Sequence, residues 1–282
     1  MALSILNNIP SMTAENQINS TQANLQKTLY RLASGSRINS GADDAAGLAI
    51  ADGLHANITA LAQSQRNAND GVGQLQVADG ALSQVTSLLN RAVTLATESS
   101  TGTVTNSQRS ALDAEFSAIK SEIDRIGTNT TFNGTSVFTA STTSIYLSDA
   151  GSSSTIGVTV GALSAAAVGT GATSVDLGSD NLLTAGSASA GAQKALTDIN
   201  TAIANVASLR GTVGASINRL QAASNVMSNQ VQNLSSAEDG IRAADIAQEV
   251  ASMSKYNILS QTGMAALSQA NQAQQAVLSL LR

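Results

Sequence analysis

The segment DIAQEVASMSKYNILSQTGMAALSQANQAQQAVLSLLR, residues 245–282, has the clearest pattern in the chain. Apolar and small polar residues recur in it at alternating spacings of four and three, which places them along one side of a helix, as in a coiled coil. No charged residue lies between Lys255 and Arg282, but Asn, Gln and Ser are too frequent for a bilayer span. We therefore expect a long helix that is buried against protein. The stripe consists of Ile246, Val250, Met253, Asn257, Ser260, Met264, Leu267, Asn271, Gln274, Leu278 and Leu281.

The N-terminal region carries a shorter version of this pattern. After Pro10, which limits where a helix starts, apolar residues follow at spacings of seven, four and three. Each chain end offers few large apolar groups, and a lone helix of this kind is marginal in water. We expect the two ends to pair, and to be loosely ordered in the free monomer. The N-terminal pattern consists of Ile18, Leu25, Leu29 and Leu32.

Composition and charge exclude several classes of function. Aromatic residues make up 2% of the chain and charged residues 12%, so long helices are favoured over a compact enzyme core. The net charge is −5 and Lys and Arg form no cluster, so we expect no nucleic-acid partner. Without Cys there is no disulfide or thiolate metal site. The first ten residues show no secretory signal pattern, so export of this chain requires another route.

Glycine and polar residues between positions 35 and 41 interrupt the first helical pattern. Ser40 is suited to cap the next helix, with Asp43 and Asp44 in the first turn, where the helix dipole favours negative charge. A domain junction is expected here.

Gly240 interrupts the pattern a second time, between the last two long helices. The two breaks predict a terminal helical domain formed by residues 1–42 and 240–282. Residues 43–239 form a second helical domain, which includes a Gly-, Ser- and Thr-rich excursion at about 128–193.

Three inner segments repeat the helical spacing, at residues 75–96, 112–126 and 196–234. In the excursion, Thr143–Leu147 and Thr155–Val160 flank a turn-rich DAGSSS segment, which is typical of a β-hairpin. The sequence therefore predicts an all-α rod of long antiparallel helices, packed as in coiled coils, with a small β-hairpin region in the middle of the chain.

Five stretches resemble bacterial flagellin in order and spacing, and they cover nearly all of both terminal regions. The resemblance implies a structural subunit that self-assembles into the flagellar filament for motility, and not an enzyme. It also implies that the subunit is exported unfolded by the flagellar type III route and that its terminal helices line the filament channel outside the cell. The chain resembles a near-minimal flagellin with a short central region. The stretches are RLASGSRINSGADDAAGLAIAD (31–52), NANDGVGQLQVADGAL (67–82), EIDRIGTNTTFNG (122–134), GASINRL (214–220) and SQANQAQQAVLSLL (268–281).

Partners follow from the same resemblance: other copies of the chain, a flagellar export chaperone, hook-associated junction proteins and the filament cap, with no nucleic acid, membrane or cofactor. Eight of the apolar residues in the two terminal patterns are the expected subunit-assembly residues. They are Ile18, Leu25, Leu29, Leu32, Met264, Leu267, Leu278 and Leu281.

Many flagellins carry a segment that a Toll-like receptor detects. The matching positions here are Arg91 and Leu95, with Glu115 on the next helix. Val93 and Thr94 replace a charged pair of that segment, which weakens the case for recognition by the receptor because two charges that can pair across an interface are lost.

Catalysis and metal binding have little support. His55 is the only histidine, no HExxH motif is present, and a lone imidazole is usually structural or solvated. Neighbouring acidic residues at 43–44 and at 122 and 124 suit a helix start and an exposed helix face. Two rival functions remain open: the flagellin-like junction protein between hook and filament, and an enzyme or adhesin that requires a folded pocket in residues 135–185.

Overall fold

The computed structural model describes residues 8–148, 154–168, 176–177, 180–182 and 188–280. Long helices dominate these residues, and short strands lie in the middle of the chain. None of the described helices combines the length and the hydropathy needed to span a bilayer. The helices are α1 (Ile9–Ser34), α2 (Ala45–Ser100), α3 (Asn106–Asn129), α4 (Ala188–Arg242) and α5 (Ile246–Leu280). The strands are β1 (Thr131–Phe132), β2 (Thr135–Ser136), β3 (Thr142–Tyr146), β4 (Thr155–Thr159), β5 (Leu163–Ser164) and β6 (Ala167–Val168).

The chain forms two compact units, unit 1 with residues 1–56 and 233–282, and unit 2 with residues 57–232. Both boundaries fall inside long helices, α2 and α4. The sequence instead predicts domain boundaries at 42/43 and 239/240, which it places at the breaks between helices. That division stays a prediction.

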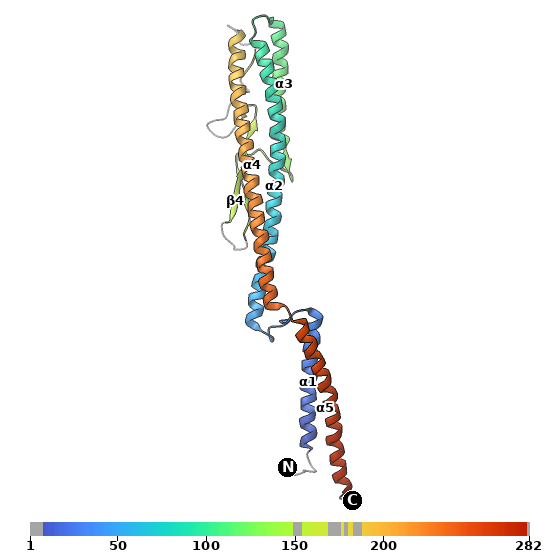
Figure 1. Ribbon diagram of the computed structural model, residues 1–282. Coiled ribbons are helices and arrows are strands. Elements are labelled where there is room, and N and C mark those ends of the chain that lie inside the picture. Colours follow the sequence, from blue (N-terminus) through green and yellow to red (C-terminus); the bar gives the residue numbers. More distant parts are fainter. Residues whose placement is uncertain (1–7, 149–153, 169–175, 178–179, 183–187, 281–282) are drawn as a thin grey trace. The chain divides into compact units, whose positions relative to one another are not determined.

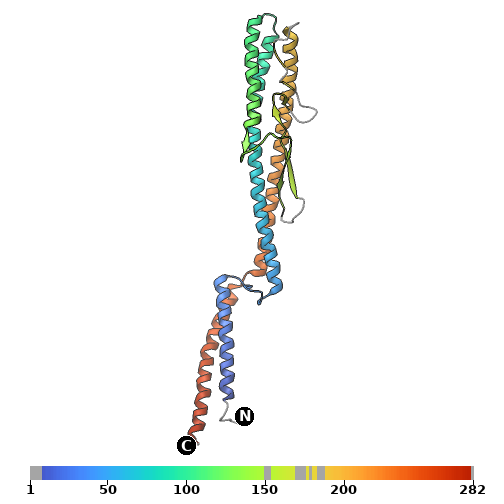
Figure 2. The ribbon, with the colours of Figure 1, turned by 180° about the vertical axis from the view of Figure 1, so that it is seen from behind.

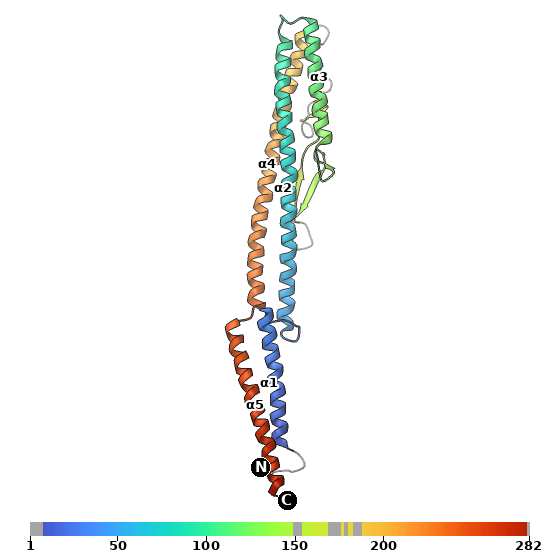
Figure 3. The same ribbon diagram turned by 90° about the vertical axis from the view of Figure 1, so that its right-hand side faces the viewer.

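Unit 1 contains the helix pair α1 and α5, which lie side by side (Figure 1 and Figure 3). The pair is antiparallel, because Asn8 at the start of α1 donates to the carbonyl of Ala270, whereas Arg31 near its end pairs with Glu249. α1 ends at Gly35, whose φ of 68° is a left-handed conformation that glycine adopts without strain.

The start of α2 differs from the prediction in two respects. Asp43 and Asp44 precede the helix and do not lie in its first turn, because the helix starts only at Ala45. Ser40 does not cap the helix; the Asp44 carboxylate accepts from the Gly47 amide at 2.9 Å, and the helix starts at Ala45. Ser40 is unavailable because its own amide and hydroxyl bond to Asp43, which closes a turn before the helix. The break predicted at Gly240 also lies slightly later, since α4 continues to Arg242.

In unit 2, α2, α3 and α4 run side by side (Figure 1 and Figure 2). Their facing sides are apolar at helical spacing and almost completely buried, as binary patterning requires. Asp79 of α2 and Arg210 of α4 form an ion pair at 2.8 Å beside this core. The largest buried side chains of these three helices are Leu61, Leu75, Leu82, Leu89, Leu95, Phe116, Ile123, Ile199 and Leu220.

The strands form three separate antiparallel pairs that cover parts of these helices. β3 and β4 pair in register from Thr142 opposite Thr159 to Tyr146 opposite Thr155, which confirms the predicted hairpin. Ile145 of this hairpin lies directly against Gly71 of α2, a contact that leaves no room for a Cβ atom. At Gly127 of α3, the carbonyl of Leu163 approaches equally closely, so β5 packs onto the helix backbone.

Candidate assembly surface

Ile18 is the centre of the contact between α1 and α5. It is only 8% exposed, and it lies over Gly263, where an added Cβ atom would stand 2.9 Å from Ile18 Cγ1. Glycine on α5 therefore forms the socket for the isoleucine on α1. Burial of one isoleucine stabilises such a contact by about 1.5–3 kcal/mol.

Polar contacts fix the register of the pair at both ends. Ser11 Oγ donates to Asn271 Oδ1 at 3.0 Å, and Asn8 Nδ2 donates to the Ala270 carbonyl at 3.4 Å. At the other end, Arg31 Nη1 lies 3.3 Å from Glu249 Oε1. A register shift of one turn would break all of these contacts.

The predicted assembly residues divide into two groups. Ile18 is buried, and Leu25, Leu32 and Leu267 are half-buried. Leu29 and Met264 are 45% and 53% exposed. The side chain of Leu278 and all of Leu281 lie outside the described residues.

The division has a geometric cause. One column of the predicted stripe, from Met253 to Gln274 at every seventh residue, is half-buried, whereas the other column lies one position away from the line that meets α1. A second half-buried column starts at Glu249 and also recurs every seven residues, and three of its members contact α1 directly: Glu249 through Arg31, Gly263 through Ile18 and Ala270 through Asn8. Apolar periodicity does not reveal these positions, because a glutamate, a glycine and an alanine fill them. The remaining member of this series is Tyr256.

Several large apolar side chains of α5 are exposed in the part of the chain that the structure describes, and Ile258 and Leu259, at 61% and 39%, lie on other sides of the helix from the residues that follow. Ile246, Val250 and Met264 are 49%, 41% and 53% exposed and belong to the same helical stripe, which we call the α5 stripe. A row of exposed apolar side chains on one side of a helix marks an interaction surface.

The residues that match the receptor segment lie in unit 2. Arg91 of α2 and Glu115 of α3 form a two-point ion pair, with Nε to Oε1 at 2.7 Å and Nη2 to Oε2 at 3.1 Å. This pairing lowers the pKa of the Glu115 carboxyl and raises the pKa of the Arg91 guanidinium. Leu95 is 1% exposed and belongs to the core, so the structure does not bring it together with the two charges at the surface.

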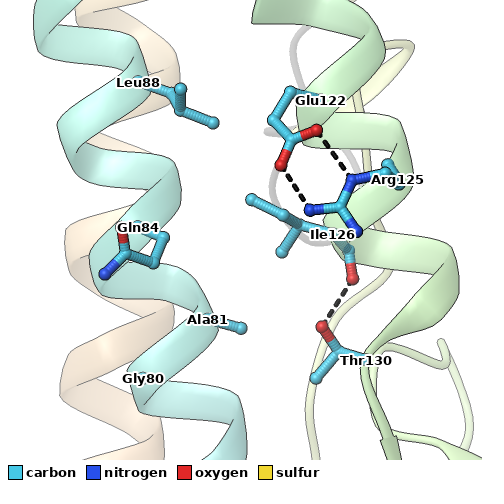
Figure 4. A pocket seen from close by; sticks show the side chains of 8 residues that line it. All are labelled: Gly80, Ala81, Gln84, Leu88, Glu122, Arg125, Ile126 and Thr130. Carbon is cyan, nitrogen blue, oxygen red and sulfur yellow. Dashed lines mark hydrogen bonds and ion pairs between the residues drawn. The ribbon is translucent and has the colours of Figure 1, made fainter.

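A shallow groove of about 430 Å³ lies between α2 and α3 (Figure 4). Ala81, Leu88 and Ile126 contribute apolar side chains to it, and Glu122 and Arg125 form an ion pair at its edge. The two charges neutralise each other, so the groove contains no free acid or base.

The other acidic residues considered for catalysis have structural roles. Asp124 accepts from the Ala165 amide at 2.7 Å, and Asp43 and Asp44 bond to backbone amides before and within the start of α2. His55 is 66% exposed and lies 3.4 Å from Glu238. In the part of the chain that the structure describes, no three His, Cys, Asp or Glu side chains gather as a metal site requires.

Comparison with known proteins finds similarity along nearly the whole chain. A family model described as the bacterial flagellin N-terminal helical region matches residues 5–143, and one described as the C-terminal helical region matches residues 196–281. Flagellin of Halalkalibacterium halodurans is 37% identical over 281 residues, covering 99% of each chain. Flagellin of Bacillus subtilis is 34% identical over 302 residues, again covering 99% of each.

Two solved structures are also similar. The crystal structure of Bacillus cereus flagellin aligns with a TM-score of 0.48 and 30% identity, covering 61% of this chain and 94% of that one. A hook-associated protein from Vibrio parahaemolyticus aligns with a TM-score of 0.56 but 17% identity, covering 71% and 100%, and this likeness concerns the fold alone.

A pair of antiparallel terminal helices and a unit of three long helices with a shared apolar core place the chain in the class of long-helix, coiled-coil-like proteins. With both family models matched and whole-length relatives above 30% identity, the chain belongs to the bacterial flagellin family. It is a structural subunit of the flagellar filament and not an enzyme. These matches favour flagellin over the hook–filament junction protein.

Proposed function

We propose that the α5 stripe of Ile246, Val250 and Met264 contacts neighbouring copies of the chain in the filament, whereas the contact of Ile18 with Gly263 holds each subunit together. The exposure of the stripe supports the first part, and the near-complete burial of Ile18 supports the second. Leu29, which is 45% exposed on α1, belongs to the same intersubunit surface in this proposal.

The rest of the predicted assembly set completes the proposal. Leu25, Leu32 and Leu267 are half-buried and act within the helix pair. Leu278 and Leu281 continue the C-terminal pattern and are proposed from the sequence alone as further contacts between copies.

We also propose that residues 1–42 and 240–282 form the inner domain that lines the filament channel, outside the cell. Residues 43–239 then form the outer domain. Polar Asn, Gln and Ser residues are abundant on α5 beside its apolar ones, and this suits a helix that contacts both protein and water.

Export of the chain in an unfolded state by the flagellar type III route is part of the same proposal, as are an export chaperone, junction proteins and the filament cap as partners. Family membership supports these partners. The few large apolar groups at both chain ends are a second argument, because a weakly held helix pair is easily kept open before assembly.

We propose that any recognition of this chain by the Toll-like receptor that detects flagellins uses the exposed Arg91–Glu115 pair. Arg91 is 57% exposed and Glu115 is 43% exposed in their side chains, whereas Leu95 is buried. Binding of the receptor ectodomain to the monomer tests this. Arg91→Ala should weaken binding, and equal binding by this variant would contradict the assignment.

Polymerisation tests the α5 stripe. Met264→Asp would bury a carboxylate among apolar side chains of a neighbouring copy, which costs about 3 kcal/mol, or about a hundredfold in the critical concentration of subunits left in solution. Gln269→Asp adds the same charge at an exposed polar position of α5 and is the matched control.

Sedimentation after polymerisation gives the critical concentration of each variant, and circular dichroism of the monomers checks that the helices persist. Normal filaments from Met264→Asp, or equal loss of filaments in both variants, would contradict the proposed surface.

A further inference from the structure

The segment between α1 and α2, residues 35–44, is attached to the last residue of α4 and to the segment that follows it by backbone hydrogen bonds. The Arg37 amide donates to the Arg242 carbonyl at 2.6 Å, and the Ala244 amide donates to the Gly35 carbonyl at 3.0 Å. Ser36 Oγ also donates to the Arg242 carbonyl. These bonds order the outer part of the linker, but none of them involves α1 or the body of α5.

Asp43 organises the inner part of this linker. Its Oδ2 accepts from the amides of Asn39 and Ser40, each at 3.3 Å, and from Ser40 Oγ at 3.2 Å. Its Oδ1 faces Lys27 Nζ at 2.5 Å and Arg31 Nη2 at 3.7 Å. One carboxylate therefore closes the turn and holds it against the last turns of α1.

Arg31 connects this carboxylate to α5. Its Nη1 lies 3.3 Å from Glu249 in the first turn of α5, while its Nη2 points at Asp43. The side chains of Asp43 and Glu249 are only 12% and 13% exposed, so both carboxylates depend on nearby positive charge. Asp43 forms an ion pair with Lys27 as well as with Arg31, whereas Glu249 pairs with Arg31.

The Arg31 guanidinium is oriented by its ion pairs with Asp43 and Glu249. Arg31 Nε is buried and has no hydrogen-bond acceptor, whereas Nη1 and Nη2 each face a carboxylate. The side chain therefore adopts an orientation that satisfies the two carboxylates and leaves Nε without a partner. A planar guanidinium spans two carboxylates in a fixed geometry, which the single ammonium of lysine does not do.

We propose that Arg31 couples the order of the 35–44 linker to the pairing of α5 with α1, so that the two form together. When α5 is paired, Glu249 holds the guanidinium against Asp43, and the turn at Asn39 and Ser40 is closed. When α5 is away, Arg31 is free to turn to solvent, and the turn loses this support. The coupling acts within one chain and does not depend on the α5 stripe.

Amide hydrogen exchange on the purified full chain tests the coupling, in the monomer and in filaments. The amides of Asn39 and Ser40 should be protected when those of α5 are protected, and exposed when those of α5 are exposed. Glu249→Gln removes a charge on α5 alone, yet it should speed exchange at Asn39 and Ser40 by about fivefold. Arg31→Gln should do the same, and adding Glu249→Gln to it should have no further effect at the linker.

Glu15→Gln is the matched control, since it removes an exposed carboxylate from α1 in the same unit. It should leave linker exchange unchanged. Two results would overturn the proposal: a linker that is protected in a state in which α5 is not, or unchanged exchange at Asn39 and Ser40 in Glu249→Gln.

Discussion

The socket at Gly263 offers a sharp test of the α1–α5 contact. Gly263→Ala improves the intrinsic helix propensity of α5 by about 1 kcal/mol. The new Cβ atom, however, would stand 2.9 Å from Ile18 Cγ1 and 3.6 Å from Cδ1, so one of the helices must move. Overpacking of this kind costs about 1–3 kcal/mol. The expected net result is a pair that is weaker by up to about 2 kcal/mol, although the substitution favours the helix itself.

Critical concentration for polymerisation measures this loss, because about 1.4 kcal/mol corresponds to a tenfold change. Gly263→Ala should raise it up to about thirtyfold. Gly240→Ala is the control: Gly240 lies in α4 of the same unit, no heavy atom stands within 4 Å of the added Cβ, and the variant should be at least as stable as the parent.

A double-mutant cycle completes the test. Ile18→Ala alone should cost about 2–4 kcal/mol, because it removes a buried side chain. In the double variant Ile18→Ala with Gly263→Ala, the new methyl group occupies part of the space that the isoleucine side chain leaves. The stability lost in the double variant should therefore be about 1–2 kcal/mol smaller than the sum of the losses in the two single variants. Strict additivity of the two substitutions in this cycle would refute the socket.

Three further predictions concern single side chains. The hydrogen bond from Lys27 is the main cause that lowers the pKa of the Asp43 carboxyl from 3.8 to about 2. The stability that this carboxylate gives to the linker is therefore present above about pH 4 and is lost as the pH falls towards 2. Amide exchange at Ser40 should rise over that pH range, and Asp43→Asn should abolish this pH dependence. Arg109 donates to the carbonyls of Ser99, Thr101 and Val104 at the turn between α2 and α3, so Arg109→Met should destabilise unit 2 by about 2 kcal/mol, seen as a lower urea midpoint. Gly127→Ala places a methyl group against the Leu163 carbonyl and should lower the melting temperature of the monomer, whereas Gly214→Ala, with free space around it, should not.

Much of the fold follows from periodicity. The apolar spacing of the inner helices identifies the core of unit 2, since Leu75, Leu82 and Leu89 are each at most 1% exposed. The hairpin could be predicted because β-branched residues flank a run of turn-forming residues. Both patterns depend only on residues that are close in the sequence, and in natural proteins such local preferences agree with the overall fold.

Other features depend on three-dimensional contacts that no periodicity encodes. The side of α5 that meets α1 is set by a glycine socket and by an ion pair, so only half of the apolar stripe lies on the contact line: Met253 and Leu267 are half-buried, whereas Met264 lies one position away from the socket at Gly263. Ser40 and Asp44 are both good capping residues, and only the turn closed by Asp43 decides between them. Leu95 matches a receptor motif in sequence, but the packing of α2 on its neighbours buries it.

Charges are unevenly distributed along the α1–α5 pair. From Ile9 to Gln26 the only charged residue is Glu15, and from Tyr256 to Leu280 there is none, whereas Lys27, Arg31 and Glu249 gather near the linker. Added salt screens the charged end, while sulfate or phosphate strengthens apolar contacts at the uncharged end. The two ends of one helix pair thus respond to the ionic medium in opposite directions, and the choice of salt, as distinct from its concentration, sets which end opens first.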